Sequence, residues 1–216
     1  MIERWLGTKA FVVHPPVNVE RYLSLARNPE REDLVITVGR IERGKRQHVI
    51  PAIARETPGV RYAIIGAIGQ TDYFQYVKRL LKRLGVEERV KIYTNLSESH
   101  KVRLLSRAKV YLHTMKYEHF GISVVEAMAA GAIPIVHRYS GPWVDIVSQL
   151  EKDIRYSYLD YNECANMILR ALSSWSPERA EKLSIYATRF NYEGFKKLFS
   201  IIVKVASSSN SKIKYA

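Results

Sequence analysis

The sequence is short of the features that build disulfide frameworks, metal clusters and membrane spans. Cys164 is its one cysteine, which excludes an internal disulfide framework, fits a reducing intracellular compartment and is expected to be a small buried side chain. No Asp-x-Asp pair occurs, so the sequence offers no obvious carboxylate site for Mg²⁺ or Mn²⁺. The longest apolar runs, such as AMAAGAIPIV at 127–136, are too short to cross a bilayer. These absences predict a cytoplasmic protein with neither a metal nor another cofactor.

What the chain has in excess is positive charge. Its 216 residues include 34 Lys and Arg against 21 Asp and Glu, for a formal net charge of +13. Such a balance predicts attraction to phosphate-rich partners, and nucleic acid, an anionic membrane surface and a nucleotide all qualify, as does a merely solvated basic surface. No nucleic-acid motif accompanies the charge, so specific nucleic-acid binding is not expected. Peripheral contact with the cytoplasmic face of a membrane is compatible with it.

Short β-branched runs alternate with helical patterns through most of the chain. The strand candidates lie at 33–40, 61–68, 89–93, 109–115 and 132–138, and the helix candidates at 45–56, 71–85, 98–108 and about 121–131. Ser97 is a candidate N-cap, and Gly85 and Gly131 are candidate helix stops. This alternation predicts an α/β fold with a Rossmann-like, doubly wound parallel sheet, in which ligands bind beyond the carboxyl ends of the strands. The segment 176–206 is typical of two helices broken at Asn191.

A candidate anion site directly follows the first strong strand. Gly39, Arg40, Gly44 and Lys45 cluster at the strand-to-helix junction, where N–H groups, the helix dipole and two cations would favour a diphosphate. A solvent-exposed basic turn explains the same residues equally well. After the second strand, GAIGQ at 66–70 lacks the GxGxxG fingerprint, which disfavours a dinucleotide-dependent oxidoreductase and suggests a role in backbone geometry.

Two carboxylates flank the start of the helix near Gly121. On one straight helix Glu118 and Glu126 would be about 12 Å apart, too far for a close carboxylate pair, so they would contact two parts of one elongated ligand. Carboxylates accept hydrogen bonds from vicinal hydroxyls, which makes a sugar or ribose a suitable partner. Alternatively, Glu126 is an exposed helix position and Glu118 complements the helix dipole. His113 and His119 are assigned structural or surface roles, since no metal-ligand or nucleophile spacing accompanies them.

Several motifs together resemble one enzyme family. EHFGISVVE at 118–126 fits the E-x7-E signature of retaining glycosyltransferases of the GT-B fold, and the segment 117–136 resembles the core of family GT4. GRIERGK at 39–45 is similar to that family's Gly-Arg-x4-Lys phosphate-binding segment, and HPPVNVERY at 14–22 to its interdomain connection. LHTM and SGPWVDIV at 140–147 are closest to mannosyltransferases that extend dolichol-linked oligosaccharides from GDP-mannose. The family's Gly-Gly-x-x-Glu is replaced here by 141–145, GPWVD, which leaves the role of Asp145 open.

The resemblance implies a role for each matching residue. Arg40 and Lys45 would hold the donor diphosphate and neutralise its developing charge, which a metal does in other transferases. Glu118 would contact the transferred sugar, and Glu126 the ribose. Arg40, Lys45 and Glu118 are therefore the catalytic candidates. The donor-binding candidates are Gly39, Arg40, Lys45, Glu118, Phe120, Gly121, Ile122 and Glu126.

The resemblance also implies a division of the chain. We expect an interdomain linker remnant at 1–22, a Rossmann-like donor-binding domain at 23–175, helices at 176–206 that pack toward a missing N-terminal domain, and a basic flexible tail at 207–216. The implied reaction is metal-independent transfer of mannose from GDP-mannose to a lipid-linked oligosaccharide or other glycan acceptor, which this half alone would perform poorly or not at all. The alternative is a non-catalytic basic α/β module that binds nucleic acid or another anionic partner.

Overall fold

One parallel sheet organises the molecule. The computed structural model describes Gly7 and residues 12–210 of the chain. The six strands of the sheet are β1 (Glu32–Val38), β2 (Arg61–Ile65), β3 (Val90–Tyr93), β4 (Ala108–His113), β5 (Ile133–His137) and β6 (Tyr156–Tyr158). They are ordered β3-β2-β1-β4-β5-β6, and every neighbouring pair is parallel. The predicted doubly wound α/β fold is confirmed, and its strand order reverses between β1 and β4.

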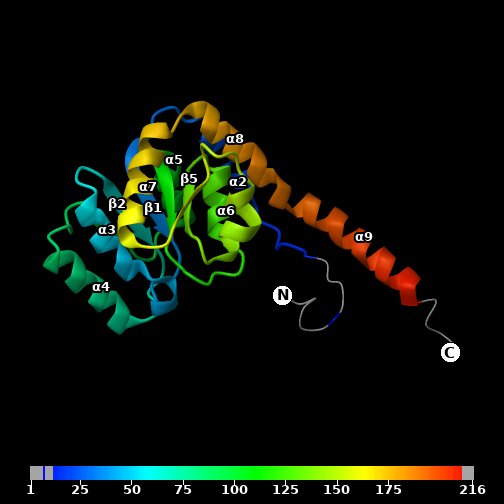
Figure 1. Ribbon diagram of the computed structural model, residues 1–216, viewed down its shortest axis with the longest axis horizontal. Coiled ribbons are helices and arrows are strands. Elements are labelled where there is room, and N and C mark those ends of the chain that lie inside the picture. Colours follow the sequence, from blue (N-terminus) through cyan, green and yellow to red (C-terminus); the bar gives the residue numbers. More distant parts are fainter. Residues whose placement is uncertain (1–6, 8–11, 211–216) are drawn as a thin grey trace.

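Helices cover both faces of this sheet (Figure 1). On one side lie α3 (Ile50–Glu56), α4 (Thr71–Arg83) and α7 (Tyr161–Ser174), and on the other α6 (Ile122–Ala129) and α8 (Pro177–Ala187), near the short α2 (Glu20–Leu23). Helix α5 (Glu98–Arg107) connects β3 to β4. Most side chains between these layers form one large apolar core, to which β4 contributes Val110, Tyr111 and Leu112, and a small second cluster involves Tyr73 and Val77 of α4. The central strands are buried on both faces, as parallel strands in a doubly wound sheet are.

The helix boundaries follow local sequence signals. In α5, the Ser97 hydroxyl accepts a hydrogen bond from the His100 N–H, as a cap at this position should. Gly85 follows α4 at φ +64°, and Gly131 follows α6 at φ +86°, both in the left-handed conformation that ends helices. These three expected boundaries are confirmed.

The helix expected at 45–56 begins later than predicted. Residues Arg43–Lys45 (η2) and Gln47–Val49 (η3) form short 3₁₀ turns, and the α-helix proper starts at Ile50. Arg46, between the two turns, has φ +58°, which an α-helix does not accommodate. The side-chain amide of Gln47 donates to the carbonyl of Arg40 at 2.7 Å, so the chain folds back here before α3 starts.

The C-terminal segment breaks at Asn191, as predicted. Helix α8 and the 3₁₀ turn Thr188–Phe190 (η6) precede that residue, and α9 (Tyr192–Asn210) follows it. Leu183 and Ala187 of α8 belong to the main core, whereas α9 projects from the body (Figure 1). Helix α8 therefore lies with the sheet, and residues 207–210 are helical, whereas 211–216 lie outside the described residues, as do 1–6 and 8–11 of the expected linker. The expected division into linker, donor-binding domain, C-terminal helices and tail stays a prediction.

Candidate functional site

The first part of the site is the loop that leaves β1. Gly39 N–H donates to the Ile65 carbonyl at 2.9 Å, which keeps the ends of β1 and β2 in register beyond the sheet. A Cβ on Gly66 would lie 1.9 Å from the Gly39 carbonyl oxygen, so the GAIGQ turn allows close backbone approach, as the sequence suggested. The loop then returns through η2, which places the Lys45 side chain against Gly39. Lys45 thus lies over the carboxyl end of β1.

Glu118 meets Lys45 from the opposite loop, which leaves β4. Lys45 Nζ lies 2.6 Å from Glu118 Oε2, and His113 Nε2, from the last residue of β4, lies 3.6 Å from the same oxygen. His113 and the Lys45 ammonium together lower the pKa of the Glu118 carboxyl to about 2, although partial burial opposes the shift. Glu118 is therefore a fixed anion at neutral pH, and it can only accept hydrogen bonds.

Backbone contacts hold the loop that carries Glu118. The Gly141 N–H donates to the Glu118 carbonyl at 2.7 Å, and a Cβ on Gly141 would lie 1.6 Å from the His119 carbonyl oxygen. Gly121, which precedes α6, has φ +86°, and a Cβ there would lie 2.6 Å from Pro142 Cγ. The turn at 140–142 therefore packs directly on the loop, and only glycine at 121 and 141 permits it.

Glu126 is on α6, five residues after Gly121. Its Oε2 lies 3.7 Å from Lys101 Nζ, and that ammonium also lies 3.0 Å from Glu98. Ser123, on the first turn of the same helix, accepts a hydrogen bond from the buried Tyr111 hydroxyl at 2.7 Å. These contacts connect α6 to α5 and β4, so the side chain of Glu126 is oriented by a basic neighbour that a ligand could share.

One hollow joins these elements at the switch point between β1 and β4. Its volume is about 390 Å³, in the range of small-molecule sites. Seven of the eight predicted donor-binding residues line it: Gly39, Lys45, Glu118, Phe120, Gly121, Ile122 and Glu126. The two carboxylates that the sequence separated by two helical turns thus face one space, Glu118 from the loop and Glu126 from the helix.

Arg40 is the exception. Its side chain is 70% exposed and pairs with Glu42 at 3.4 Å, and it is not among the residues that line the hollow. The backbone carbonyl of Arg40 is fixed by Gln47, but the guanidinium is directed to solvent. A contact between Arg40 and a donor diphosphate stays a prediction.

Sequence reasoning passed over two residues of this site. His113 was assigned a structural or surface role, yet it is 5% exposed and faces Glu118; Gln47 was not singled out and is fully buried beside it. The position of His113 directly after a buried β-branched run was the available signal, since side chains at carboxyl strand ends reach the ligand edge. Asp145 lies elsewhere, in a hollow of about 300 Å³ between the turn Pro142–Ile146 (η4) and α9.

The described residues hold neither a metal-ligand cluster nor a membrane-spanning helix. Over Gly7 and residues 12–210, no three His, Cys, Asp or Glu side chains gather as a metal-ligand set. In the same part of the chain, no helix has the length and apolar character needed to span a membrane. Cys164 is buried, free and fully enclosed by the core, as expected of a small apolar side chain.

Fold and site together define an α/β domain of the kind that binds nucleotide-containing ligands at its strand ends. The family profile described as "Glycosyl transferases group 1" matches residues 23–190, and the chain belongs to that family. The predicted glycosyltransferase family and the predicted GT-B type of fold are confirmed.

Two curated relatives carry the same name, "GDP-Man:Man(3)GlcNAc(2)-PP-Dol alpha-1,2-mannosyltransferase". The human protein is 30% identical over 90% of this chain, and the Dictyostelium discoideum protein is 27% identical over 94% of it. Each alignment covers 43% of the relative, so the chain spans less than half the length of these proteins.

Solved structures share the fold at lower identity. Anabaena HepE in complex with UDP and glucose superposes with a TM-score of 0.74 at 20% identity, over 90% of this chain and 57% of that one. Sucrose-phosphate synthase from Thermosynechococcus elongatus gives 0.76 at 21% identity, over 96% and 56% of the two chains.

Proposed function

We propose that this chain is the donor-binding half of a retaining, metal-independent glycosyltransferase that transfers mannose from GDP-mannose to a lipid-linked oligosaccharide or other glycan acceptor. The observation that carries the proposal is the convergence of Lys45, Glu118 and Glu126 on one hollow at the β1/β4 switch point. The names of the curated relatives support mannose, the GDP donor and a lipid-linked acceptor.

The hollow offers carboxylates for the two sugar rings of a nucleotide sugar and a cation for the diphosphate between them. Glu118, held ionised, accepts hydrogen bonds from sugar hydroxyls, and Glu126 accepts them from the ribose diol. The first turn of α6 presents N–H groups that have no partner within the helix, and they suit the phosphates. Lys45, only 27% exposed, supplies the positive charge closest to them.

The same residues also stabilise the leaving group of the proposed reaction. In a retaining transfer the leaving diphosphate gains negative charge as the sugar bond breaks, and preorganised cations stabilise that charge. Lys45 fills this role from inside the hollow, with Arg40 approaching from the rim once the ligand supplies a second anion. This arrangement takes the place of a divalent metal, so donor binding should proceed in the presence of a chelator.

The remaining part of the protein would complete the site. Helix α9 carries exposed apolar residues along its length: Leu198, Phe199, Ile201, Val203 and Val205. Burying such a face against another domain is favourable by about 25 cal/mol per Å². We assign α9 to contact with an N-terminal domain that also binds the acceptor, and residues 1–22 to the connection. Peripheral contact of the basic surface with the cytoplasmic face of an anionic membrane belongs to the same proposal.

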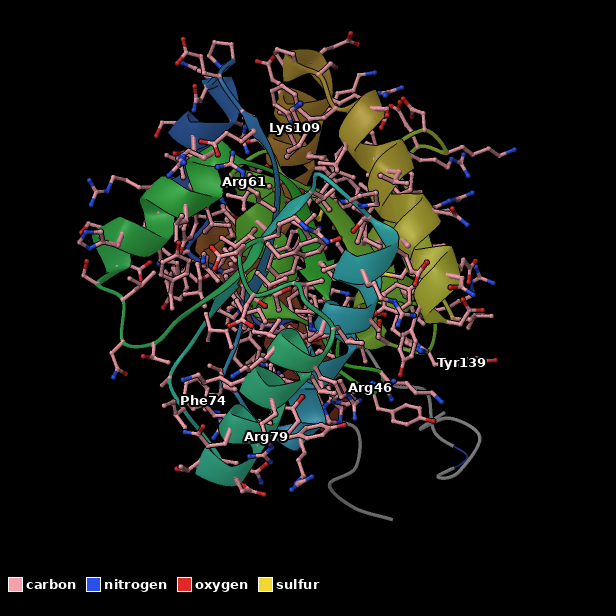
Figure 2. The ribbon with its side chains drawn as sticks, turned by 90° about the vertical axis from the view of Figure 1, so that its left-hand side faces the viewer. Arg46, Arg61, Phe74, Arg79, Lys109 and Tyr139 are labelled. Carbon is pink, nitrogen blue, oxygen red and sulfur yellow. The ribbon has the colours of Figure 1, made fainter. Side chains whose placement is uncertain are left out.

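The alternative, a basic module for nucleic acid, has one feature in its favour. Helix α4 exposes Lys78, Arg79, Lys82 and Arg83, and Figure 2 shows Phe74 and Arg79 on this helix. Aromatic and basic side chains together suit single-stranded nucleic acid. This surface lies outside the hollow, so the two functions make separable predictions.

Calorimetric titration of the chain with GDP, UDP, ADP and GDP-mannose, in EDTA, tests the proposal. We expect GDP to bind more tightly than the other diphosphates. Glu126→Ala should lower the affinity for GDP at least tenfold, because the ribose contact is lost. Glu88→Gln, at a side chain that is 92% exposed, is the matched control and should bind as the native chain does. Selective binding of UDP would refute the donor assignment. Absence of nucleotide binding together with steeply salt-dependent binding of oligonucleotides would favour the basic module.

A further inference from the structure

Two buried polar atoms behind the Lys45–Glu118 pair have no hydrogen-bond partner among the described residues. They are the side-chain carbonyl oxygen Oε1 of Gln47, which is 0% exposed, and Nδ1 of His113, which is 5% exposed. The other end of each side chain is engaged, since Gln47 Nε2 donates to the Arg40 carbonyl and His113 Nε2 faces Glu118. An unsatisfied buried polar atom costs about 1–3 kcal/mol, so two in one place indicate an occupant.

Both side chains line the same small hollow under the β1 and β4 ends. It has a volume of about 10 Å³, close to what a single water molecule requires, and Thr37, Tyr111 and Thr114 contribute polar side chains to its wall. The hollow is too small for any part of a nucleotide sugar. It adjoins the donor hollow, and Val38, Gly39 and Lys45 border both.

We infer that one buried water bridges Gln47 Oε1 and His113 Nδ1, and that this bridge holds His113 with a hydrogen on Nε2, directed at Glu118. Gln47 Oε1 can only accept, so the water donates to it and has its second hydrogen available for the Nδ1 lone pair. The Glu118 carboxylate also only accepts, which requires the hydrogen on the opposite ring nitrogen. The other tautomer would set the Nε2 lone pair against an anion and leave Nδ1–H directed at the water.

Gln47 and His113 are therefore positioning residues rather than catalytic ones. Glu118 receives Lys45 from η2 and His113 from β4, and these two elements are tied together because the Thr114 hydroxyl, directly after β4, donates to the Lys45 carbonyl. The His119 N–H donates to the other carboxylate oxygen, Oε1, at 3.2 Å, so contacts at both oxygens set the orientation of Glu118 at the edge of the donor hollow. The consequence for sugar binding rests on the proposed function, whereas the state of His113 does not.

The test is ¹⁵N NMR of the histidine rings, combined with calorimetry. In the native chain we expect the His113 signals of an Nε2–H ring. Gln47→Met, which removes the acceptor oxygen, should give mixed tautomers of His113. It should weaken the binding of GDP-mannose about tenfold and leave the binding of GDP unchanged, since Glu118 contacts the sugar. Gln47→Glu retains an acceptor oxygen but loses the N–H that donates to the Arg40 carbonyl, and His113 should keep its hydrogen on Nε2 in this variant. Gln149→Met, at an exposed glutamine, is the control.

The outcomes separate the inference from the proposed function. If His113 keeps the hydrogen on Nε2 in Gln47→Met, the inferred water bridge is refuted. Equal loss of the Nε2–H form in the Met and Glu variants would also overturn it, because Gln47 would then act through the Arg40 carbonyl. If Gln47→Met does not fold, a crystal structure of the native chain decides: a water within hydrogen-bond distance of both atoms is expected, and a dry hollow refutes the bridge. Tautomer changes as described without any nucleotide binding would uphold the bridge and refute the function.

Discussion

Replacing Glu118 by Gln should destabilise the protein in a pH-dependent way. The carboxyl has a folded-state pKa of about 2 against an ordinary value of 4.5, and its side chain is 17% exposed. A pKa that is lowered on folding contributes stability above the unfolded value and loses it as pH falls through the folded value. At 1.36 kcal/mol per pH unit, the contribution is about 3 kcal/mol at pH 7 and roughly half of that at pH 3.

Urea unfolding of the native chain and of Glu118→Gln at pH 7, 5 and 3 measures this directly. The difference in unfolding free energy between the two proteins should shrink as the pH falls from 4.5 toward 2. Glu88→Gln, whose carboxylate is almost fully exposed, should stay within about 0.5 kcal/mol of the native chain at every pH. A difference that is the same at pH 3 as at pH 7 would show that the contacts of the ionised carboxylate with Lys45 and His113 are not its source.

Three further predictions concern the scaffold and the site. Gly141→Ala, whose Cβ would meet the His119 carbonyl oxygen, should lower the unfolding free energy by about 3 kcal/mol or more in urea, whereas Gly44→Ala, with nothing within 4 Å, should be neutral. Arg31→Leu should cost about 3–4 kcal/mol in the same assay, because it removes four hydrogen bonds from the guanidinium to main-chain carbonyls, of which those to Leu105, Ala108 and Ala130 are buried. Glu118→Gln should bind GDP at least as tightly as the native chain but GDP-mannose about tenfold more weakly, and an equal loss of both in calorimetry would contradict the sugar-reading role.

The sheet could be predicted from local sequence because its strands are buried on both faces. Continuous β-branched runs such as the one ending at Val38 have few alternatives once helical patterns flank them. Strand β6 has three residues and no β-branched side chain, so it forms only because β5 offers a parallel edge. Helix α7 is absent from the elements predicted above, although its sequence carries helix signals. Asp160 caps it, and Cys164, Ile168 and Leu172 repeat at helical spacing.

The site could be predicted as a set of residues but not as a set of contacts. Gly39 and Lys45 follow one strand and Glu118 another, and strand ends in a parallel sheet share an edge, so their convergence was foreseeable. That Lys45 reaches Glu118 while Arg40 faces solvent depends on the left-handed residue Arg46 and on the fold-back that it produces. Such backbone details have no periodic signature in the sequence.

The ion pair between Lys45 and Glu118 has a consequence for how a donor would bind. A diphosphate needs the Lys45 ammonium, and Glu118 already holds it at 2.6 Å, so the incoming anion competes for a cation that has three donors. Because the His119 N–H donates to Glu118 Oε1 at 3.2 Å and His113 Nε2 lies 3.6 Å from Oε2, the carboxylate keeps partners when Lys45 turns toward the phosphates. These additional contacts thus allow Lys45 to serve the leaving group without releasing Glu118 from its position beside the sugar. If Lys45 were the sole partner of Glu118, its movement toward the diphosphate would leave the carboxylate without a partner.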